Sequence, residues 1–463
     1  MKIKKQILII LITIYTFISI LLYTNPILAT NSTNSSQQTS NSGTNTPKTS
    51  TNQSTTSTQN LTLASEGAIL IDSKTGKILY GKNENQKLYP ASTTKILTAI
   101  LAIEHCKPTD KITASYDAVM SIPAGYSNAA IQPGETIAFQ DLLDMFLIHS
   151  ANEIGNIFAE HISGSVEDFS TLMNKKAAQL GCKNTHFKNP SGIHDTEHYS
   201  TAYDMALIAR YCMKNETFRK TVSKLTCTVE PTDKYEKRFF RNTNQLIDPS
   251  SDYYYEYAIG AKTGYTSQAK RCLIAASSKD NLELITVVLG AQSSTPDTRY
   301  LDTINLFEYG YSNYKIQKIA NKNSIIKEIV VENATKETEN LSLLLKNDIT
   351  GLVPTNWTDS NPSVKLNESI SAPIAEGDIL GKITYNIDGI EYSSDLIASH
   401  AVEEFNLKLT IAQIALALFL LFILSKLLLP KKKSKKRKSK KKKSGTKKNK
   451  NSKNYYDSIY KFN

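Results

Sequence analysis

A run of apolar residues near the C-terminus restricts the arrangement of this chain more than any other feature of its sequence. Residues 409–429, LTIAQIALALFLLFILSKLLL, number 21 and include one charged side chain, Lys426. At about 1.5 Å of rise per residue, a helix of this length just crosses a hydrocarbon layer of about 30 Å. A lysine-rich segment follows at once, and such segments stay on the cytoplasmic side of a membrane. The sequence therefore predicts a transmembrane helix at 409–429, a cytoplasmic tail at 430–463 and a body outside the cell.

The N-terminus carries the three parts of a secretory signal. Three lysines within the first five residues precede an apolar run at 7–23, and Ala29 offers a small residue for cleavage. This order predicts a signal peptide at 1–29, and the length of the apolar run leaves an uncleaved anchor as the alternative. With the signal removed, the chain is expected to be a single-pass protein of the cell membrane.

The basic charge of the chain is concentrated in its tail. The formal net charge is +12, but residues 431–453 hold fifteen of the 55 basic side chains, which leaves 40 basic against 43 acidic residues elsewhere. A body so close to neutrality is not a nucleic-acid-binding surface. The tail is expected to contact anionic lipid on the cytoplasmic face. Nucleic-acid binding by the tail is the alternative, and we do not expect it.

The cysteines and histidines do not form an evident metal site or disulfide framework. The odd number of cysteines and the absence of a C-x-x-C pair favour buried free thiols. The five are Cys106, Cys182, Cys212, Cys227 and Cys272. His194 and His198 are spaced like zinc ligands, but with Asp195 and Asp204 they define no complete ligand set in a segment that reads as a loop. No metal and no cofactor is therefore expected.

Composition and periodicity divide the region between the two membrane segments into three parts. Residues 30–60 are mostly Ser, Thr, Asn and Gln, which predicts a disordered linker. Residues 61–315 read as strands, then helices, then strands, which indicates an α+β domain whose antiparallel sheet joins both ends of the segment. Residues 316–400 contain short alternating strands separated by Gly, Asn and Asp turns, which predicts a small all-β domain.

Several elements of the α+β domain are expected from local patterns. A hairpin is predicted at 66–83 around a D-S-K-T-G turn, and a second one around 279–281. Apolar residues at helical spacing predict helices across 92–214. A last helix is expected from Pro296 to Tyr309, with Thr295 as its cap.

The first chemically suggestive pattern is Ser92-Thr93-Thr94-Lys95, at the start of a strongly apolar helix. Residues three apart share a helix face, so the Ser92 hydroxyl would lie beside the Lys95 amine. A serine hydroxyl becomes a nucleophile when a neighbouring base removes its proton. Lysine can be that base only if its pKa falls by roughly three units, which is about 4 kcal/mol. The alternative is that Ser92 caps the helix and Lys95 is solvated.

Two further patterns follow in the sequence. Ser150-Ala151-Asn152 falls where one apolar helix ends and another begins, and its alternative role is again that of a helix cap. Lys262-Thr263-Gly264 lies on a predicted strand, where a glycine is unfavourable unless something approaches the backbone closely. A substrate lying along this edge is the expected neighbour. The same tripeptide at residues 74–76 reads as an ordinary hairpin turn, so order and context separate the two copies.

Together these patterns resemble the penicillin-recognising serine enzymes, which carry S-x-x-K, S-x-N and K-T-G in this order. The similarity is greatest to the D-alanyl-D-alanine carboxypeptidases of peptidase family S11. It covers about 63–315, through blocks such as YPASTTKILTAILAIE, SANE and GAKTGYTSQAKRCLIAAS. The resemblance implies a β-lactamase/transpeptidase-like fold, and the segment 316–399 is similar in place and size to the family's C-terminal domain.

The resemblance also implies a reaction. Ser92 would attack the carbonyl of the penultimate D-alanine of a peptidoglycan stem peptide and form an acyl-enzyme, with Lys95 as general base. Ser150 would relay a proton to the leaving amine, and Asn152 would hold the substrate amide and Lys95. Water would then release the shortened peptide. β-Lactam antibiotics would act as acylating inhibitors.

The same resemblance assigns the substrate-binding residues. Lys262 would bind the terminal carboxylate and help to keep Lys95 neutral. Thr263 and Gly264 would line the substrate, and the backbone N–H groups of Ser92 and Tyr265 would form the oxyanion hole. The chain departs from the family pattern at residues 270–271, Lys-Arg, which puts the rim near the K-T-G strand in doubt.

Two other functions remain open at this point. A class A β-lactamase would need an E-x-x-L-N pattern between Asn152 and Lys262, and the sequence has none there. A penicillin-binding sensor or wall-binding module without turnover would use the lysine tail for signalling. The three complete catalytic patterns argue against that second function.

Overall fold

The computed structural model describes residues 61–292 and 295–428. The predicted signal peptide at 1–29, the linker at 30–60 and the tail at 430–463 lie outside the described residues.

A five-stranded antiparallel sheet joins the two ends of the α+β segment, as its strand–helix–strand order predicts. The strand order is β2-β1-β9-β8-β7. The strands are β1 (Gly67–Asp72), β2 (Ile78–Lys82), β7 (Ala258–Thr266), β8 (Lys270–Lys279) and β9 (Leu282–Ala291). The two predicted hairpins are β1–β2 and β8–β9. Asp280 and Asn281 both have positive φ, as the tight turn between β8 and β9 requires.

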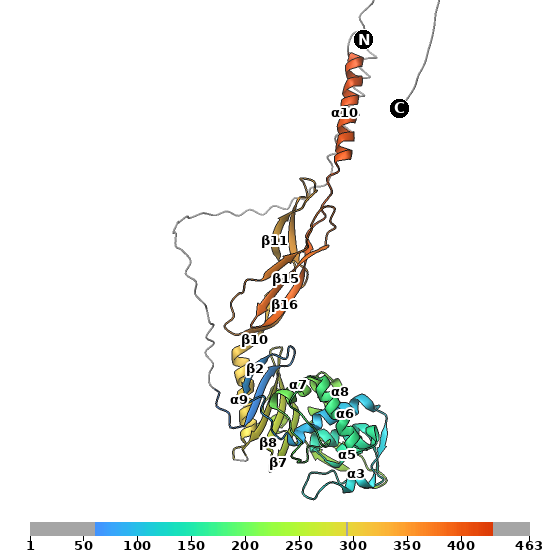
Figure 1. Cartoon of the computed structure of the whole chain (residues 1–463), viewed down its shortest axis with the longest axis vertical. Helices are drawn as coiled ribbons and strands as arrows, with labels where there is room; N and C mark the ends of the chain where they lie inside the picture. The colour runs from blue at the N-terminus through green and yellow to red at the C-terminus, as the bar shows by residue number, and fades with distance from the viewer. Residues whose placement is uncertain (1–60, 293–294, 429–463) are drawn as a thin grey trace, which may run out of the picture. The chain divides into compact units, whose positions relative to one another are not determined.

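Helices cover both faces of this sheet, because alternate residues of its strands point to opposite sides. Leu70 and Leu284 pack with the buried side chains of α9 (Thr298–Asn313), whereas Ile71 and Ile285 pack with those of α2 (Lys95–His105) and α7 (Ala202–Met213). Figure 1 shows α9 on one side of the sheet and the remaining labelled helices of this part of the chain on the other.

The predicted start of the last helix is wrong. Helix α9 begins at Thr298, two residues after Pro296, and its cap is Asp297, whose side chain accepts the Arg299 N–H. A carboxylate caps a helix as well as a hydroxyl does. The nearer carboxylate therefore takes the place that the sequence suggested for Thr295.

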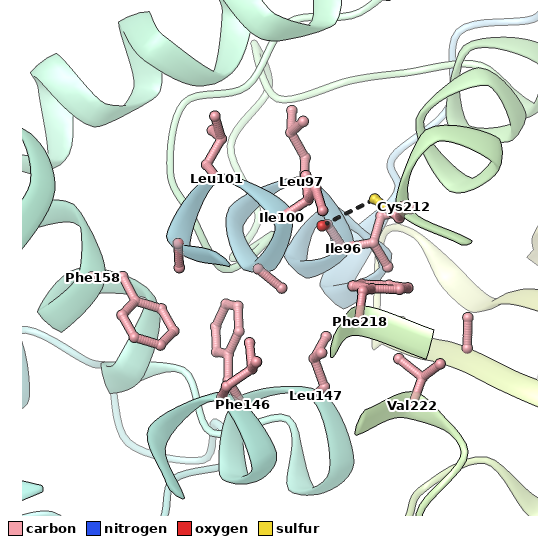
Figure 2. Packing of buried hydrophobic residues seen from close by; sticks show 14 of the residues in the cluster. Ile96, Leu97, Ile100, Leu101, Phe146, Leu147, Phe158, Cys212, Phe218 and Val222 are labelled. Carbon is pink, nitrogen blue, oxygen red and sulfur yellow. Dashed lines mark hydrogen bonds between the residues drawn. The ribbon is translucent and has the colours of Figure 1, made fainter. Parts of the chain in front are cut away.

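Helix α2 is the centre of the larger core. Its residues from Lys95 to Ala102 are all buried, so the helix is enclosed on every side rather than amphipathic. Figure 2 shows its apolar side chains surrounded by those of neighbouring helices. These neighbours are η2 (Met145–His149, a π-helix), α5 (Glu153–Ser163), α7 and α8 (Glu216–Val222). A helix with so many apolar neighbours is a rigid base for side chains at its N-terminus.

Smaller elements complete this part of the chain. They are η1 (Ala91–Thr94), β3 (Lys111–Thr113), α3 (Tyr116–Met120), β4 (Thr136–Ala138), α4 (Phe139–Asp144), α6 (Val166–Gln179), β5 (Thr226–Val229), β6 (Arg238–Arg241) and η3 (Gln245–Ile247). We call residues 121–135, which connect α3 to β4, the pocket loop.

The following segment folds as an all-β unit with its own buried core, as predicted. Its larger sheet has the order β11-β12-β16-β15-β14, and β10 pairs with β13. The strands are β10 (Tyr314–Ala320), β11 (Ile325–Val330), β12 (Asn340–Leu345), β13 (Ile349–Pro354), β14 (Ser363–Leu366), β15 (Ile379–Ile387) and β16 (Ile390–Ala398).

The predicted apolar helix is present as α10 (Leu407–Leu428). Residues 407–426 are long and apolar enough to cross a membrane, and none of that window is buried by other parts of the chain. In the described residues this is the one helix that meets both conditions.

Candidate active site

The S-x-x-K pattern forms a single turn. Ser92 lies within the short 3₁₀ helix η1, and α2 begins at Lys95. Lys95 Nζ is 2.9 Å from Ser92 Oγ. Neither η1 nor α2 has a side-chain cap, so the Ser92 hydroxyl is not used as the cap that the alternative required.

The Lys95 amine is fully buried and surrounded by acceptors. Besides Ser92 Oγ, Nζ lies 2.7 Å from Asn152 Oδ1 and 2.8 Å from the Ser191 carbonyl oxygen. Burial first, and the charge of Lys262 second, hold the pKa of Lys95 well below its usual value, while Glu153 acts in the opposite direction. Both lowering causes disfavour the ammonium form, which is what a lysine general base needs.

The S-x-N pattern lies at the junction between η2 and α5. Ser150 has a left-handed backbone, with φ of 67°, which is uncommon for a residue with a side chain and often marks a functional site. Asn152 precedes α5 but makes no cap hydrogen bond with its side chain. Its Nδ2 instead donates to the Ser127 carbonyl oxygen at 2.8 Å, and its Oδ1 accepts from Lys95. Asn152 therefore links Lys95 to the pocket loop.

The K-T-G strand β7 passes directly beside the turn that carries Ser92. A Cβ atom added to Gly264 would lie 3.0 Å from the backbone nitrogen of Ser92. The close neighbour that this glycine admits is thus the Ser92 backbone, and not the substrate that the sequence suggested. Thr263 Oγ1 is 2.7 Å from Thr243 Oγ1, and Tyr265 is exposed.

Lys262 lies deeper than the sequence suggested. It is 1 % exposed and donates to the carbonyl oxygen of Thr263 at 3.0 Å. Burial, followed by the charge of Arg299, lowers the pKa of Lys262 to about 7. The charge of Lys262 therefore influences Lys95, but its side chain does not line the cavity described next.

A cavity of about 610 Å³ opens in front of Ser92. That volume suits a peptide end or a drug-sized molecule. It is lined by Ser92, Ser150, Asn152, Thr243, residues 124–127 of the pocket loop, residues 263–268 and Arg299. Three of the predicted patterns therefore meet at one cavity, although they are separated by up to 170 residues in the sequence.

Arg299 lines the cavity, although no sequence pattern indicates this role. It pairs with Asp297 at 3.1 Å, and its Nε has no hydrogen-bond partner in the described structure. Arg271 pairs with the same carboxylate, while Lys270 pairs with Glu66. Arg271 therefore shares with Arg299 the carboxylate that fixes it, and neither Lys270 nor Arg271 lines the cavity.

The segment 189–198 is a second element that sequence reasoning missed. It supplies the Ser191 carbonyl to Lys95, and Asn189 Oδ1 accepts three successive backbone N–H groups that shape the turn. Gly192 has φ of +78°, and a Cβ there would lie 1.9 Å from the Ala91 carbonyl oxygen. The N-P-S-G sequence is a turn signal, but it does not reveal what the turn contacts.

His198 anchors the same segment and is not a metal ligand here. Its Nδ1 accepts the Lys188 N–H at 3.2 Å, so its Nε2 donates to Thr94 Oγ1 at 2.9 Å. Burial lowers the pKa of His198 to about 3. The Asp204 carboxylate accepts hydrogen bonds from the backbone N–H groups of residues 183 and 184 and from the Thr185 hydroxyl. Within the described ranges, the one group spaced to hold a metal is Cys106, Asp110 and His161, at the other end of α2.

Comparisons with known proteins agree with this geometry. Residues 52–293 match the family model described as D-alanyl-D-alanine carboxypeptidase, and residues 314–404 match that of the C-terminal domain of penicillin-binding protein 5. The chain is 36% identical to the D-alanyl-D-alanine carboxypeptidase DacF of Bacillus subtilis, over 70% of this chain and 82% of the relative. It is 30% identical to DacA of Haemophilus influenzae, over 72% and 83%. The solved structure of penicillin-binding protein 5 from Haemophilus influenzae is similar with a TM-score of 0.57 at 28% identity, over 74% of this chain and 99% of that one.

Proposed function

The chain belongs to the D-alanyl-D-alanine carboxypeptidase family, peptidase family S11, and we propose that Ser92 is its nucleophile and Lys95 its general base. The protein is a serine-type carboxypeptidase that removes the terminal D-alanine from peptidoglycan stem peptides. The observation that carries the residue assignment is the buried amine of Lys95, 2.9 Å from Ser92 Oγ. The pKa of that amine is lowered, so it can accept the hydroxyl proton.

Acylation begins with transfer of the Ser92 proton to neutral Lys95. Ser92 Oγ then bonds to the carbonyl carbon of the penultimate D-alanine, and the carbonyl oxygen becomes an oxyanion. The backbone N–H groups of Ser92 and Tyr265 stabilise this oxyanion, which is typically the largest electrostatic contribution to such a reaction. The close approach of Gly264 to the Ser92 nitrogen supports this role, because it brings β7 beside that N–H group.

The tetrahedral intermediate collapses when its C–N bond breaks. The leaving amine of the terminal D-alanine takes the proton from the Lys95 ammonium through Ser150, which lines the cavity. Asn152 keeps Lys95 in position and has an N–H group directed to the pocket loop. A water molecule, deprotonated by the same base, then cleaves the ester and frees the shortened peptide.

Arg299 and Thr263 hold the terminal carboxylate of the substrate. Both line the cavity, and a guanidinium beside a hydroxyl suits a carboxylate. Lys262 does not contact the substrate directly, but its positive charge disfavours protonation of Lys95. This assignment moves the direct carboxylate contact from Lys262 to Arg299.

The enzyme acts outside the cell while attached to the membrane. A signal peptide at 1–29 and helix α10 support this arrangement, and the lysine tail at 430–463 would remain in the cytoplasm and bind anionic lipid. Such binding contributes about 1 kcal/mol per basic residue near the surface. Truncation after residue 406 should release the protein into the medium, whereas truncation after 429 should leave it bound.

The decisive test of the residue assignment is intact mass against time for the full chain in detergent with benzylpenicillin. Wild type should gain one long-lived penicilloyl adduct, and Ser92→Ala none. Ser267→Ala, an exposed serine of the same cavity, is the matched control and should acylate like wild type. A fleeting adduct with rapid loss of drug would instead indicate a β-lactamase. Absence of any adduct, together with no release of D-alanine, would favour a binding module without turnover.

A further inference from the structure

Glu153 is a buried carboxylate that the mechanism above does not use. It follows Asn152, whose Oδ1 is 2.7 Å from Lys95 Nζ, is the first residue of α5, and is 2 % exposed. One carboxylate oxygen, Oε1, accepts the Ala129 N–H at 2.6 Å. The other, Oε2, is buried and has no hydrogen-bond partner within the described residues. A buried carboxylate is unfavourable unless charge or hydrogen bonds compensate it.

The compensation comes from two directions. Burial raises the pKa of Glu153, while backbone N–H groups, among them that of Ala129, and the positive charge of Lys95 oppose this rise. The influence is mutual, because Glu153 favours the protonated form of Lys95. The two side chains therefore interact electrostatically inside the protein, where water screens them little.

The charged and titratable groups around Lys95 come from three elements. Lys262 on β7 disfavours the ammonium, His198 from the segment 189–198 is kept neutral by burial, and Glu153 on α5 favours the ammonium. Among these described groups, Glu153 is the one that can carry negative charge. Arg299 acts on Lys262 rather than on Lys95.

Glu153 also lies where the pocket loop is fastened to the catalytic residues. Ser127, which lines the cavity, accepts hydrogen bonds from both the backbone N–H and the side chain of Asn152. Two residues further along, Ala129 donates to Glu153. One residue pair, Asn152 and Glu153, thus connects the base on one side to the cavity wall on the other.

We propose that Glu153 is a positioning residue that stabilises the ammonium formed on Lys95 during acylation and holds the pocket loop through its Oε1 atom. The proton itself moves from Ser92 Oγ to Lys95 Nζ, and Glu153 exchanges none. In the free enzyme, burial and Lys262 keep Lys95 neutral. When the oxyanion forms and Lys95 becomes cationic, the fixed negative charge of Glu153 lowers the energy of that charge-separated state. This inference rests on the proposed function of Ser92 and Lys95.

The test is the pH dependence of acylation by benzylpenicillin for the full chain in detergent. Glu153→Gln keeps an oxygen for the Ala129 N–H but removes the charge. The maximal acylation rate should fall by about tenfold or more, because a charge that stabilises the transition state is lost. The acid limb of the profile should move to lower pH, because without Glu153 the ammonium of Lys95 is less favoured.

Two variants separate charge from shape. Glu153→Asp keeps the charge but shortens the reach to Ala129, so the rate should fall while the acid limb stays near its wild-type position. Glu153→Met removes the charge without leaving an unpaired amide, and should move the acid limb as Gln does, even if Gln does not fold.

Glu135→Gln is the matched control for structural damage. Glu135 is a fully buried glutamate at the end of the pocket loop. It pairs with Arg238 at 2.8 Å and is not among the charges that shift the pKa of Lys95. Its replacement should lower the melting temperature and leave the acid limb unchanged.

The outcomes are distinguishable. If wild type forms a Ser92 adduct but the acid limb of Glu153→Gln and Glu153→Met stays in place or moves to higher pH, the inference is overturned and the proposed function stands. If wild type forms no adduct, both are overturned.

Discussion

Replacement of Gly264 by alanine tests whether strand β7 positions Ser92 through direct backbone contact. The added methyl group would lie 3.0 Å from the Ser92 nitrogen, 3.1 Å from the Pro90 oxygen and 3.1 Å from the Thr93 nitrogen. All three are backbone atoms of the turn that carries Ser92, so no flexible side chain can move aside. No positive φ is recorded for Gly264, which means that strain in its own backbone does not add to the effect.

The expected size follows from these distances. Ordinary contacts begin at 3.4 Å, so β7 and the Ser92 turn must separate by a few tenths of an ångström. Overpacking of this kind costs about 1–3 kcal/mol, which corresponds to a fall in Tm of about 2–12 °C for a domain of this size. Since a displacement of about 1 Å can reduce a rate about 100-fold, the acylation rate should fall by about tenfold.

The assay compares the second-order rate of acylation by a fluorescent penicillin with the melting temperature of each variant. Gly81→Ala is the matched control, because Gly81 lies on β2 at the opposite edge of the same sheet. Its added methyl would meet the end of the flexible Glu84 side chain, so activity should remain at the wild-type level. Wild-type acylation by Gly264→Ala would refute the idea that this strand fixes the position of Ser92.

Two further predictions concern titration. Burial lowers the pKa of His198 to about 3, below its value near 6.5 in the unfolded chain, so stability should fall with pH below about 6.5 and lose about 2 kcal/mol by about pH 5. Thermal melts of His198→Gln should show a flatter pH dependence, and equal slopes would contradict the burial of a neutral imidazole. Burial and Arg299 hold the pKa of Lys262 at about 7, so Arg299→Gln should raise it and move the basic limb of D-alanine release to higher pH. The same variant should raise KM about tenfold for a substrate with a free carboxylate. If both the basic limb of the pH profile and KM stay unchanged, Arg299 does not bind the carboxylate.

The sequence predicts the elements whose cause is local. The β8–β9 hairpin follows from alternating strands around Asp280 and Asn281, which tolerate positive φ. The proximity of Ser92 and Lys95 follows from their spacing within one helical turn. The start of α9 differs from the prediction because two capping residues, Thr295 and Asp297, compete there, and Asp297 is the one that accepts the Arg299 N–H.

The rest of the site depends on contacts between distant segments. Ser191 reaches Lys95 from 96 positions further along the chain, and Arg299 enters the cavity from the beginning of α9. The N-P-S-G pattern around Ser191 indicates a turn but not its contact with Lys95, and no local pattern distinguishes Arg299. The depth of Lys262 was also unpredictable, because a strand that alternates between two faces does not reveal which face receives a helix.

The burial of Lys95 explains why the S-x-x-K pattern begins such an apolar helix. Burial disfavours the ammonium form of Lys95, and the rest of the fold has to compensate for that loss of hydration. Burial of a single Leu or Ile side chain contributes about 1.5–3 kcal/mol toward this compensation. Leu97 and Ile100, both essentially without solvent exposure, are two such side chains. A solvated amphipathic helix would keep its N-terminal lysine in water and protonated. The apolar character of α2 is therefore a requirement of the chemistry at its N-terminus, and not only of the core.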